Sequence, residues 1–218
     1  MGAITRTAAN NFTTGGVILP AAINDTSVTS LTELENVAAG GTMNLISEQT
    51  ASGSASIEFT TGIDSTYPNY IIKLINIHPA NDRPDFTMNL TTDGTNFNVS
   101  KTTTVIECYS WENDSTPIFL YRDLDLANGT GEQSIAVGCG NDNDENICSI
   151  IHLFNPSSTT FVKHFLIDTQ FTEGQGICFR QPVAGYANTT SAITGIRFKF
   201  ASGNIDSGTF KLYGISGS

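Results

Sequence analysis

The chain has 218 residues, a length at which all-β sandwiches often form one unit with a sizeable core. Hydrophobic residues make up 39% and charged residues 14%, while Thr, Ser, Asn and Gly are abundant, which favours strands and turns over helices. The 21 acidic side chains against 10 basic ones give a net charge of −11 without any Lys/Arg cluster, so we expect no nucleic-acid partner.

Residues 1–41 are rich in Thr, Ala, Asn and Gly and contain a single aromatic residue, Phe12. Such a segment buries too little apolar area to fold on its own, so it predicts an extended N-terminal arm. The run Gly15-Gly-Val-Ile-Leu-Pro20 suits an extended peptide that lies on another surface. No stretch reaches the ~20 apolar residues of a membrane span, and no signal peptide is recognisable, which predicts folding in a cytoplasm.

From residue 42 onward the sequence predicts a series of strands separated by turns. Phe86, Met88 and Leu90 alternate with polar residues, and the following Asp93-Gly94 is typical of a hairpin turn. Ile196, Phe198 and Phe200 form a second clear alternation near the C-terminus. About ten such segments favour an all-β, jelly-roll-like antiparallel β-sandwich over residues 42–218, with the strand order left open.

The stretch Gly138-Cys-Gly-Asn-Asp-Asn-Asp-Glu-Asn-Ile-Cys148 contains candidate calcium ligands in Asp142, Asp144 and Glu145, together with the Asn141 and Asn143 amides. Carboxylate and amide oxygens are ligands that Ca²⁺ prefers, but the spacing lacks the sixth-position glycine and the distal glutamate of an EF-hand loop. Gly, Asn and Asp also adopt turn conformations easily. We therefore favour a solvated connection between strands over a weak metal site.

The four cysteines, Cys108, Cys139, Cys148 and Cys178, contain no pair at the two-residue spacing of zinc knuckles or thioredoxin-like motifs. Cys139 and Cys148 would face each other if the stretch 138–148, which we call the acidic loop, were a hairpin, but a reducing cytoplasm disfavours a disulfide between them. We expect four buried free thiols.

The histidines are His78, His152 and His164. A hairpin centred on Ser158 would place His152 directly across from His164, within reach of one metal ion or one proton path. A shift of one residue would separate them onto opposite faces. Since their neighbours are apolar, a structural pair is the favoured interpretation.

Glycoside hydrolysis needs two carboxylates beside a groove, and the glutamates are scattered near predicted strand ends and turns. The tyrosines and Trp111 could stack on sugar rings, although aromatic residues are also ordinary core material. No Gly-x-Ser-x-Gly motif is present. We expect neither an enzyme nor a bound cofactor. The residues concerned are Glu58, Glu107, Glu112, Glu132, Glu173, Tyr70, Tyr109, Trp111, Tyr121, Tyr186 and Tyr213.

Three segments stand out by their phrasing and order: LINIHPANDRPDFTMNLTTDGTNFNVSKTTT, IHLFNPSSTTFVKHF and AGYANTTSAITGIRFKFASGNIDSGTFKLYGI. Together they resemble a group of virion structural proteins of marine tailed bacteriophages, and the likeness spans roughly residues 70–215. The resemblance implies a decoration, fibre or tail-associated subunit of the virion and carries no catalytic motif.

Together with the resemblance, the sequence leads us to expect a capsid decoration or cement subunit, made in the host cytoplasm and located in the virion. It would form a homo-oligomer, most simply a trimer, and bind the major capsid protein or other virion proteins, with residues 1–41 as a docking arm. A tail or head fibre that contacts host surface glycans is the first alternative, and a glycan-active enzyme is the second.

Overall fold

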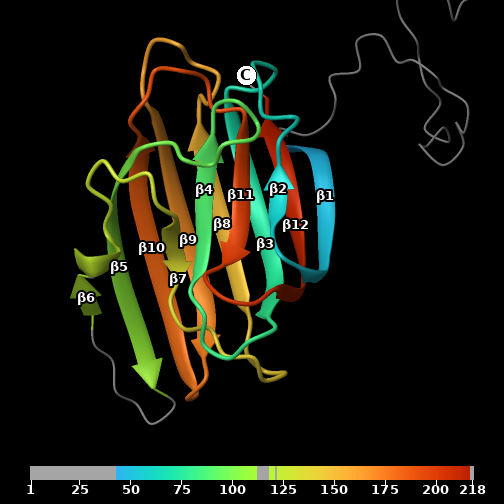
Figure 1. The fold of residues 1–218 in the computed structure, drawn as a ribbon, viewed down its shortest axis with the longest axis vertical. Coiled ribbons are helices and arrows are strands. Elements are labelled where there is room, and N and C mark those ends of the chain that lie inside the picture. Colours follow the sequence, from blue (N-terminus) through green and yellow to red (C-terminus); the bar gives the residue numbers. More distant parts are fainter. Residues whose placement is uncertain (1–42, 112–117, 121, 217–218) are drawn as a thin grey trace, which may run out of the picture. The chain divides into compact units, whose positions relative to one another are not determined.

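The computed structural model describes residues 43–111, 118–120 and 122–216, and these residues form antiparallel strands with one short 3₁₀ helix (Figure 1). The predicted arm, residues 1–41, lies outside the described residues. The elements are β1 (Met43–Ser54), β2 (Ile57–Phe59), β3 (Asn69–Pro79), β4 (Phe86–Thr91), β5 (Lys101–Trp111), β6 (Ile118–Leu120), η3 (Arg122–Leu124), β7 (Gln133–Ala136), β8 (Ile147–Phe154), β9 (Lys163–Glu173), β10 (Ile177–Ala187), β11 (Gly195–Phe200) and β12 (Ile205–Ile215).

The strands form two sheets that pack face to face, which confirms the predicted antiparallel β-sandwich. The larger sheet has the order β1-β12-β3-β8-β9-β10-β5-β6, and the smaller one has the order β2-β11-β4-β7. Without β5, β6, β9 and β10, the remaining eight strands pass from one sheet to the other at every step except from β4 to β7, which are neighbours in the smaller sheet. Their order, β1-β12-β3-β8 over β2-β11-β4-β7, is the jelly-roll arrangement of two Greek keys. The four additional strands all widen the larger sheet at one edge.

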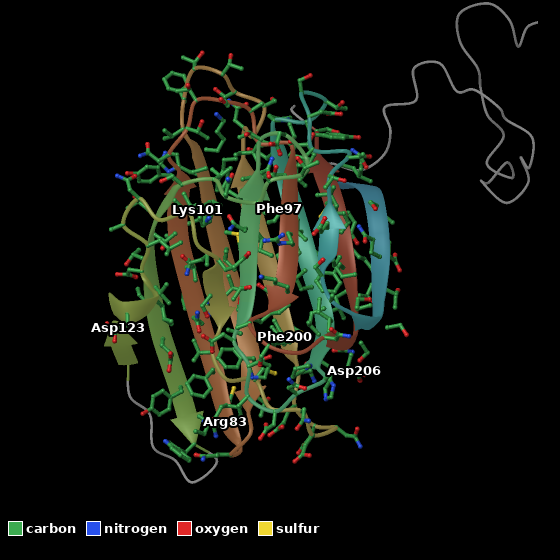
Figure 2. The ribbon with its side chains drawn as sticks, viewed as in Figure 1. Arg83, Phe97, Lys101, Asp123, Phe200 and Asp206 are labelled. Carbon is green, nitrogen blue, oxygen red and sulfur yellow. The ribbon has the colours of Figure 1, made fainter. Side chains whose placement is uncertain are left out.

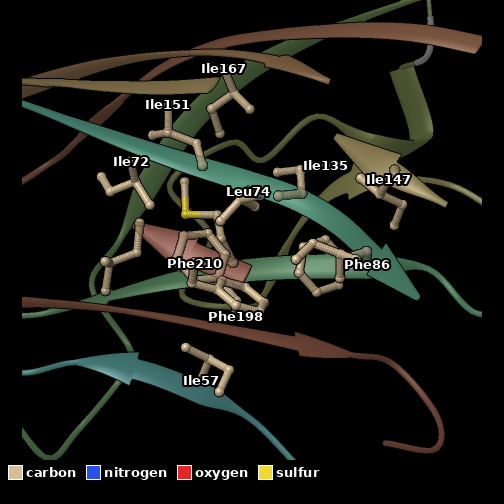
Figure 3. Packing of buried hydrophobic residues seen from close by; sticks show 14 of the residues in the cluster. Ile57, Ile72, Leu74, Phe86, Ile135, Ile147, Ile151, Ile167, Phe198 and Phe210 are labelled. Atoms are coloured by element: carbon tan, nitrogen blue, oxygen red, sulfur yellow. The ribbon is translucent and has the colours of Figure 1, made fainter. Parts of the chain in front are cut away.

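An apolar core fills the space between the two sheets of the jelly roll (Figure 3). Phe86 of β4 and Phe198 of β11 lie in the smaller sheet, with ring centroids 6.2 Å apart, and Phe210 of β12 reaches Phe198 from the larger sheet at 5.7 Å. Strict alternation along the strands brings these rings inward. Each buried ring stabilises the fold by about 2 kcal/mol through the apolar area that it removes from water.

The turn predicted at Asp93-Gly94 is present, but it does not close a hairpin. Gly94 has a φ of 78°, and Asp93 Oδ1 accepts hydrogen bonds from the backbone N–H groups of Thr95 and Asn96. The chain then crosses to the larger sheet as β5, because β4 already pairs with β11 and β7 on its two sides.

The inner face of the added strands mixes buried polar side chains with apolar ones. Gln133 of β7 accepts a hydrogen bond from Thr103 Oγ1 at 2.6 Å and donates one to the Ser134 carbonyl at 2.8 Å. β7 lies over β9 and β10, but it is only four residues long, whereas β9 and β10 each have eleven (Figure 1). The smaller sheet therefore leaves part of this inner face uncovered.

Candidate functional site

A hollow of about 410 Å³ lies on the uncovered inner face of β5, β9 and β10. Arg83, from the connection between β3 and β4, lines this hollow and is labelled near the lower end of the strands in Figure 2. We call this hollow the inner-face groove and define it by Arg83, Glu107, Tyr109, Trp111, Glu173 and Phe179.

Period-two alternation along the strands places these side chains on one face. On β5, Glu107, Tyr109 and Trp111 follow Val105, which is fully buried in the core. Across the sheet, Ile177 of β10 pairs with both Trp111 and Glu173. The groove is therefore built on three neighbouring strands with fixed register.

Two carboxylates in the groove are nearly enclosed by protein. Glu107 is 6% exposed, and the side chain of Glu173 is 5% exposed. Arg83 forms an ion pair with Oε1 of Glu173. The Oε2 atoms of both glutamates have no hydrogen-bond partner within the described part of the chain. Burial raises the pKa of Glu107, since an enclosed carboxylate loses its hydration.

Aromatic rings form the apolar wall of the groove. Tyr109 contacts Phe179 with centroids 5.1 Å apart and Trp111 at 6.5 Å in an edge-on arrangement. Phe179 stacks on the deeper ring of Phe171 at 4.9 Å. Flat rings beside hydrogen-bond acceptors offer both kinds of contact that a ligand rich in hydroxyl groups makes.

The two carboxylates of the groove come from backbone positions that lie far apart. Glu173 lies two strands away from Trp111, and Glu107 lies four residues from Trp111 along β5. At about 3.3 Å per residue and 4.8 Å per strand, the two Cα atoms are roughly 16 Å apart. The Glu173 carboxylate is already paired with Arg83. Since hydrolysis of a glycoside needs two available carboxyl groups, the groove favours binding over cleavage.

The outer face of the same strands presents exposed apolar side chains around a shallow hollow of about 380 Å³. Ile106 is 40% exposed, Ile150 is 44% exposed and Leu166 is 49% exposed. We call this surface the outer-face patch and define it by Thr104, Ile106, Ile150, Leu166, Asp168, Arg180 and Pro182.

The charges in the outer-face patch neutralise each other. Arg180 donates two hydrogen bonds of 2.8 Å to the two oxygens of Asp168, and this contact lowers the pKa of the Asp168 carboxyl. Lys73 borders the patch on β3 and lies over the ring of Tyr213 at 5.6 Å. On a chain with a net charge of −11, this surface therefore has little net charge of its own.

The acidic loop connects β7 in the smaller sheet to β8 in the larger one, so it is a crossing between sheets and no hairpin. Asp142 and Asp144 are exposed, whereas Glu145 is buried and its Oε2 accepts a hydrogen bond of 2.9 Å from the Asp142 backbone N–H. Gly140 makes room for that carboxylate, because a Cβ there would overlap it. No group of three metal-ligating side chains occurs among the residues that the structure describes.

All four cysteines are free thiols in the structure, but the expected burial is wrong for Cys108, Cys148 and Cys178, which take outward positions of β5, β8 and β10. Burial raises the pKa of Cys139 to about 12, with the charge of Glu145 as a further cause. Cys148 lies beside Asn76, with Sγ 3.7 Å from Asn76 Oδ1. The hairpin that would have brought Cys139 and Cys148 together does not form, because Cys139 bridges Glu173 of β9 while Cys148 on β8 pairs with Gln170 of the same strand.

The predicted direct pairing of two histidines is wrong. His152 on β8 lies opposite Leu166, and His164 on β9 lies opposite Tyr186. The two strands are paired two residues out of the expected register, because the turn includes Asn155 in a left-handed conformation with a φ of 44°. Both rings have aromatic neighbours: His152 stacks with Phe154, and His164 lies against Tyr186. Nδ1 of the third histidine, His78, lies 3.5 Å from Oδ2 of Asp206.

The structure brings together two of the scattered glutamates, Glu107 and Glu173, in the inner-face groove. Glu58 is half-buried on β2 and accepts a hydrogen bond of 3.2 Å from Ser56, and Glu132 pairs with Arg197 at 2.6 Å. Glu112 lies outside the described residues. The alternation Val105, Glu107, Tyr109 was a signal in the sequence that could have placed Glu107 on the inner face.

Comparison of the chain with protein-family models, with curated proteins and with solved structures found no match. Within the described residues, no helix has the length and apolar character needed to cross a membrane. The fold thus defines a jelly-roll sandwich with a widened sheet, and the two surfaces of that sheet are the basis for a functional proposal.

Proposed function

We propose that the chain is a structural subunit of a bacteriophage virion, most concretely a capsid decoration subunit, which assembles through the outer-face patch. The observation that carries this proposal is the exposure of Ile106, Ile150 and Leu166 on one flat sheet face. Clustered exposed apolar side chains indicate a surface that another macromolecule covers. The jelly-roll arrangement, which viral capsid domains use, and the resemblance of three segments to virion proteins support the same class.

A second copy of this chain is the occupant that the charges favour. Two copies with a net charge of −11 repel each other over most of their surfaces. The outer-face patch, where Arg180 neutralises Asp168, allows close approach without that repulsion. Since most oligomers of soluble proteins consist of identical subunits, we propose a homo-oligomer, most simply a trimer, which then docks on the major capsid protein.

Substitution of Ile150 and Leu166 by Glu tests this interface. We expect the wild-type protein to be oligomeric at micromolar concentration by light scattering and sedimentation, and the double variant to be monomeric, since buried like charges oppose association. Phe161→Glu is the matched control, because Phe161 is 70% exposed outside the patch. A monomeric wild-type protein, or an unchanged double variant, would contradict the proposed interface.

Electron microscopy of intact particles of the source virus tests the location. We expect density for this sandwich in many copies on the capsid surface. Density confined to the tail or to a fibre would contradict the decoration role and support the fibre role. Absence of the chain from purified particles would refute the proposal that it is a virion protein.

A receptor-binding fibre or tail component that contacts host surface glycans is a second candidate, and the inner-face groove is the observation that favours it. Tyr109 and Trp111 provide ring faces, and Glu107 provides an acceptor that is already desolvated. Titration calorimetry with neutral and acidic polysaccharides tests this role. We expect Trp111→Ala to lose any binding of the wild-type protein, whereas Phe161→Ala retains it.

A glycan-active enzyme is the least favoured of the three functions, since the Glu173 carboxylate of the groove is already paired with Arg83. Incubation of the protein with the same polysaccharides, followed by an assay for reducing ends, tests it. Turnover by the wild-type protein that Glu107→Gln or Glu173→Gln abolishes would overturn the proposal that the chain is no enzyme.

A further inference from the structure

Asn89 of β4 and Lys101, the first residue of β5, lie together in the protein interior. Lys101 is 0% exposed and Asn89 is 1% exposed, and Figure 2 labels Lys101 near the upper end of β5. A lysine is almost never fully buried without a specific partner. The strands of these two residues belong to different sheets, so their contact joins the two layers of the sandwich.

The two side chains meet at an unusually short distance. Lys101 Nζ lies 2.5 Å from Asn89 Oδ1 and 2.8 Å from the Val99 carbonyl oxygen. Because the amide C=O bond is about 1.23 Å long, Nζ lies at most about 3.7 Å from the Asn89 amide carbon. Reacting atoms in near-attack conformers are about 3–3.5 Å apart. The amine therefore lies close to attack distance.

The Asn89 amide is held in one orientation. The Leu90 backbone N–H donates a hydrogen bond to Oδ1 at 2.9 Å, and Nδ2 donates to the carbonyl oxygens of Thr130 at 3.2 Å and Gly131 at 3.4 Å. A backbone N–H that already points at a carbonyl oxygen stabilises the negative charge that forms there during attack on the carbon. The fixed amide is thus prepared for nucleophilic attack.

Burial changes the protonation of Lys101. Loss of hydration lowers its pKa to about 8, although the negative charge of Glu132 partly opposes the fall. A desolvated lysine with such a pKa contains a substantial fraction of neutral amine near neutral pH, and the neutral amine is the nucleophilic form.

Glu132 supplies a carboxylate beside this pair. Its Oε1 contacts Arg197 at 2.6 Å and Lys199 at 3.6 Å. Its Oε2 is buried and makes no hydrogen bond to any described residue. One oxygen is thus anchored, while the other is free to accept and return a proton.

We propose that Lys101 and Asn89 condense into an intramolecular isopeptide bond, with Glu132 as the proton carrier. The lone pair of neutral Nζ attacks the Asn89 amide carbon, and the C=O electrons move to Oδ1, where the Leu90 N–H stabilises them. Glu132 takes one proton from Nζ and delivers it to Nδ2. When the C=O bond re-forms, the C–Nδ2 bond breaks and ammonia leaves. One hydrogen stays on the new amide nitrogen, and no oxidation or reduction occurs.

Lys163 provides an internal comparison. It is also fully buried, and burial lowers its pKa, but its Nζ contacts the backbone carbonyl of Thr189 at 3.1 Å. A backbone peptide carbonyl has no ammonia to release. Lys163 should therefore remain an amine under every condition in which Lys101 reacts.

Intact mass spectrometry of the full-length, denatured protein tests the cross-link. We expect the wild-type chain to be lighter than its sequence by one ammonia molecule, and a protease digest to contain a branched peptide that joins the segments around Asn89 and Lys101. Asn89→Ala and Lys101→Met should show the full sequence mass, while Lys163→Met retains the loss. The branched peptide excludes a succinimide at another asparagine, since that product stays within one peptide.

Glu132→Gln tests the proton carrier. The variant should fold, as circular dichroism would show, but acquire the cross-link at least ten-fold more slowly after refolding, and Glu132→Asp should partly restore the rate. Cross-linking of the wild-type protein should speed up as the pH rises towards 8. A wild-type chain that keeps its full sequence mass after days at pH 8–9 would overturn the proposal, and an unchanged rate in Glu132→Gln would remove Glu132 from the reaction.

Discussion

The eight jelly-roll strands and the four added strands share an alternating pattern of side chains, but they direct different kinds of side chain inward. Between the jelly-roll sheets the inward side chains are apolar, as in the cluster of Phe86, Phe198 and Phe210. On β5 and β9 the inward positions instead include Glu107 and Glu173. An apolar interior stabilises a fold, whereas enclosed carboxylates oppose it. The comparison teaches that stability resides in the jelly roll and that the added strands retain costly groups for another purpose.

The largest effect is expected in the jelly-roll core. Phe198→Ala should lower the free energy of unfolding by about 3–5 kcal/mol, because it removes a fully buried ring and leaves a cavity. Phe179→Ala, at the groove wall of the added strands, should cost clearly less, since its neighbourhood is open. Urea denaturation of both variants measures the difference. Equal losses of unfolding free energy in the two variants would contradict the distinction between the jelly-roll core and the added strands.

The second prediction contrasts two arginines that form ion pairs with carboxylates of β9. Arg83→Ala leaves the buried Glu173 carboxylate without its ion pair and should destabilise the protein by roughly 1–3 kcal/mol. Arg180→Ala removes an ion pair at the exposed outer face, where water and salt screen the charges, and should cost clearly less. The midpoint of thermal unfolding at neutral pH ranks the two. A larger loss for Arg180 would mean that the outer face contributes more to stability than the groove.

The third prediction concerns the sign of a stability change. Glu107→Gln should raise the free energy of unfolding at pH 7 by about 1 kcal/mol, because a neutral amide is easier to bury than a carboxylate whose Oε2 makes no hydrogen bond to any described residue. If the groove binds a glycan, the same variant should bind it less tightly. Glu58→Gln, at a half-buried position on β2, serves as the control.

The pH dependence of this gain follows from the raised pKa of Glu107. The folded state binds the proton more readily than the unfolded state, so the penalty is full above the raised folded-state pKa and disappears as the pH falls to the ordinary value for Glu. The advantage of Glu107→Gln should therefore shrink on acidification. An advantage that grows at low pH would contradict the assigned cause.

The smallest effect is expected from removal of residues 1–41. The composition of this segment predicts little buried apolar area, so the truncated protein should unfold within roughly 2 °C of the full chain. Its attachment to particles should be lost if the segment is a docking arm. A large drop in the unfolding midpoint would show that the segment belongs to the folded body.

Much of the sandwich could be predicted because period-two alternation is a local signal. The strand containing Phe86, Met88 and Leu90 and the one containing Ile196 and Phe198 are both present. β1 had no separate prediction, since its pattern is irregular and its pairing with β12 shifts between Leu45 and Ser47. The strand order could not be derived, because no periodic pattern in the sequence marks where the chain crosses from one sheet to the other.

The candidate sites were harder to predict because they depend on pairings between distant segments. The register of the hairpin that holds His152 and His164 depends on backbone conformation at Asn155, and a two-residue error there changed every opposing partner. The groove needs Glu173 beside Trp111, which only the shared neighbour Ile177 establishes. The contact between Asn89 and Lys101 likewise depends on how two sheets stack.

The position of β5 in the sheet has a consequence for the order of folding. Val105 of β5 pairs with Val183 of β10, which follows it by 78 residues. The edge of β5 that pairs with β10 therefore stays unpaired until most of the chain has emerged from the ribosome. Pairings so distant in sequence slow folding, because a long loop must close first. Lys101 also pairs with Ala187 of β10, so its enclosure belongs to this late step. Ammonia release would then follow completion of the native state. A nascent chain would contain no covalent cross-link before its strands are correctly paired.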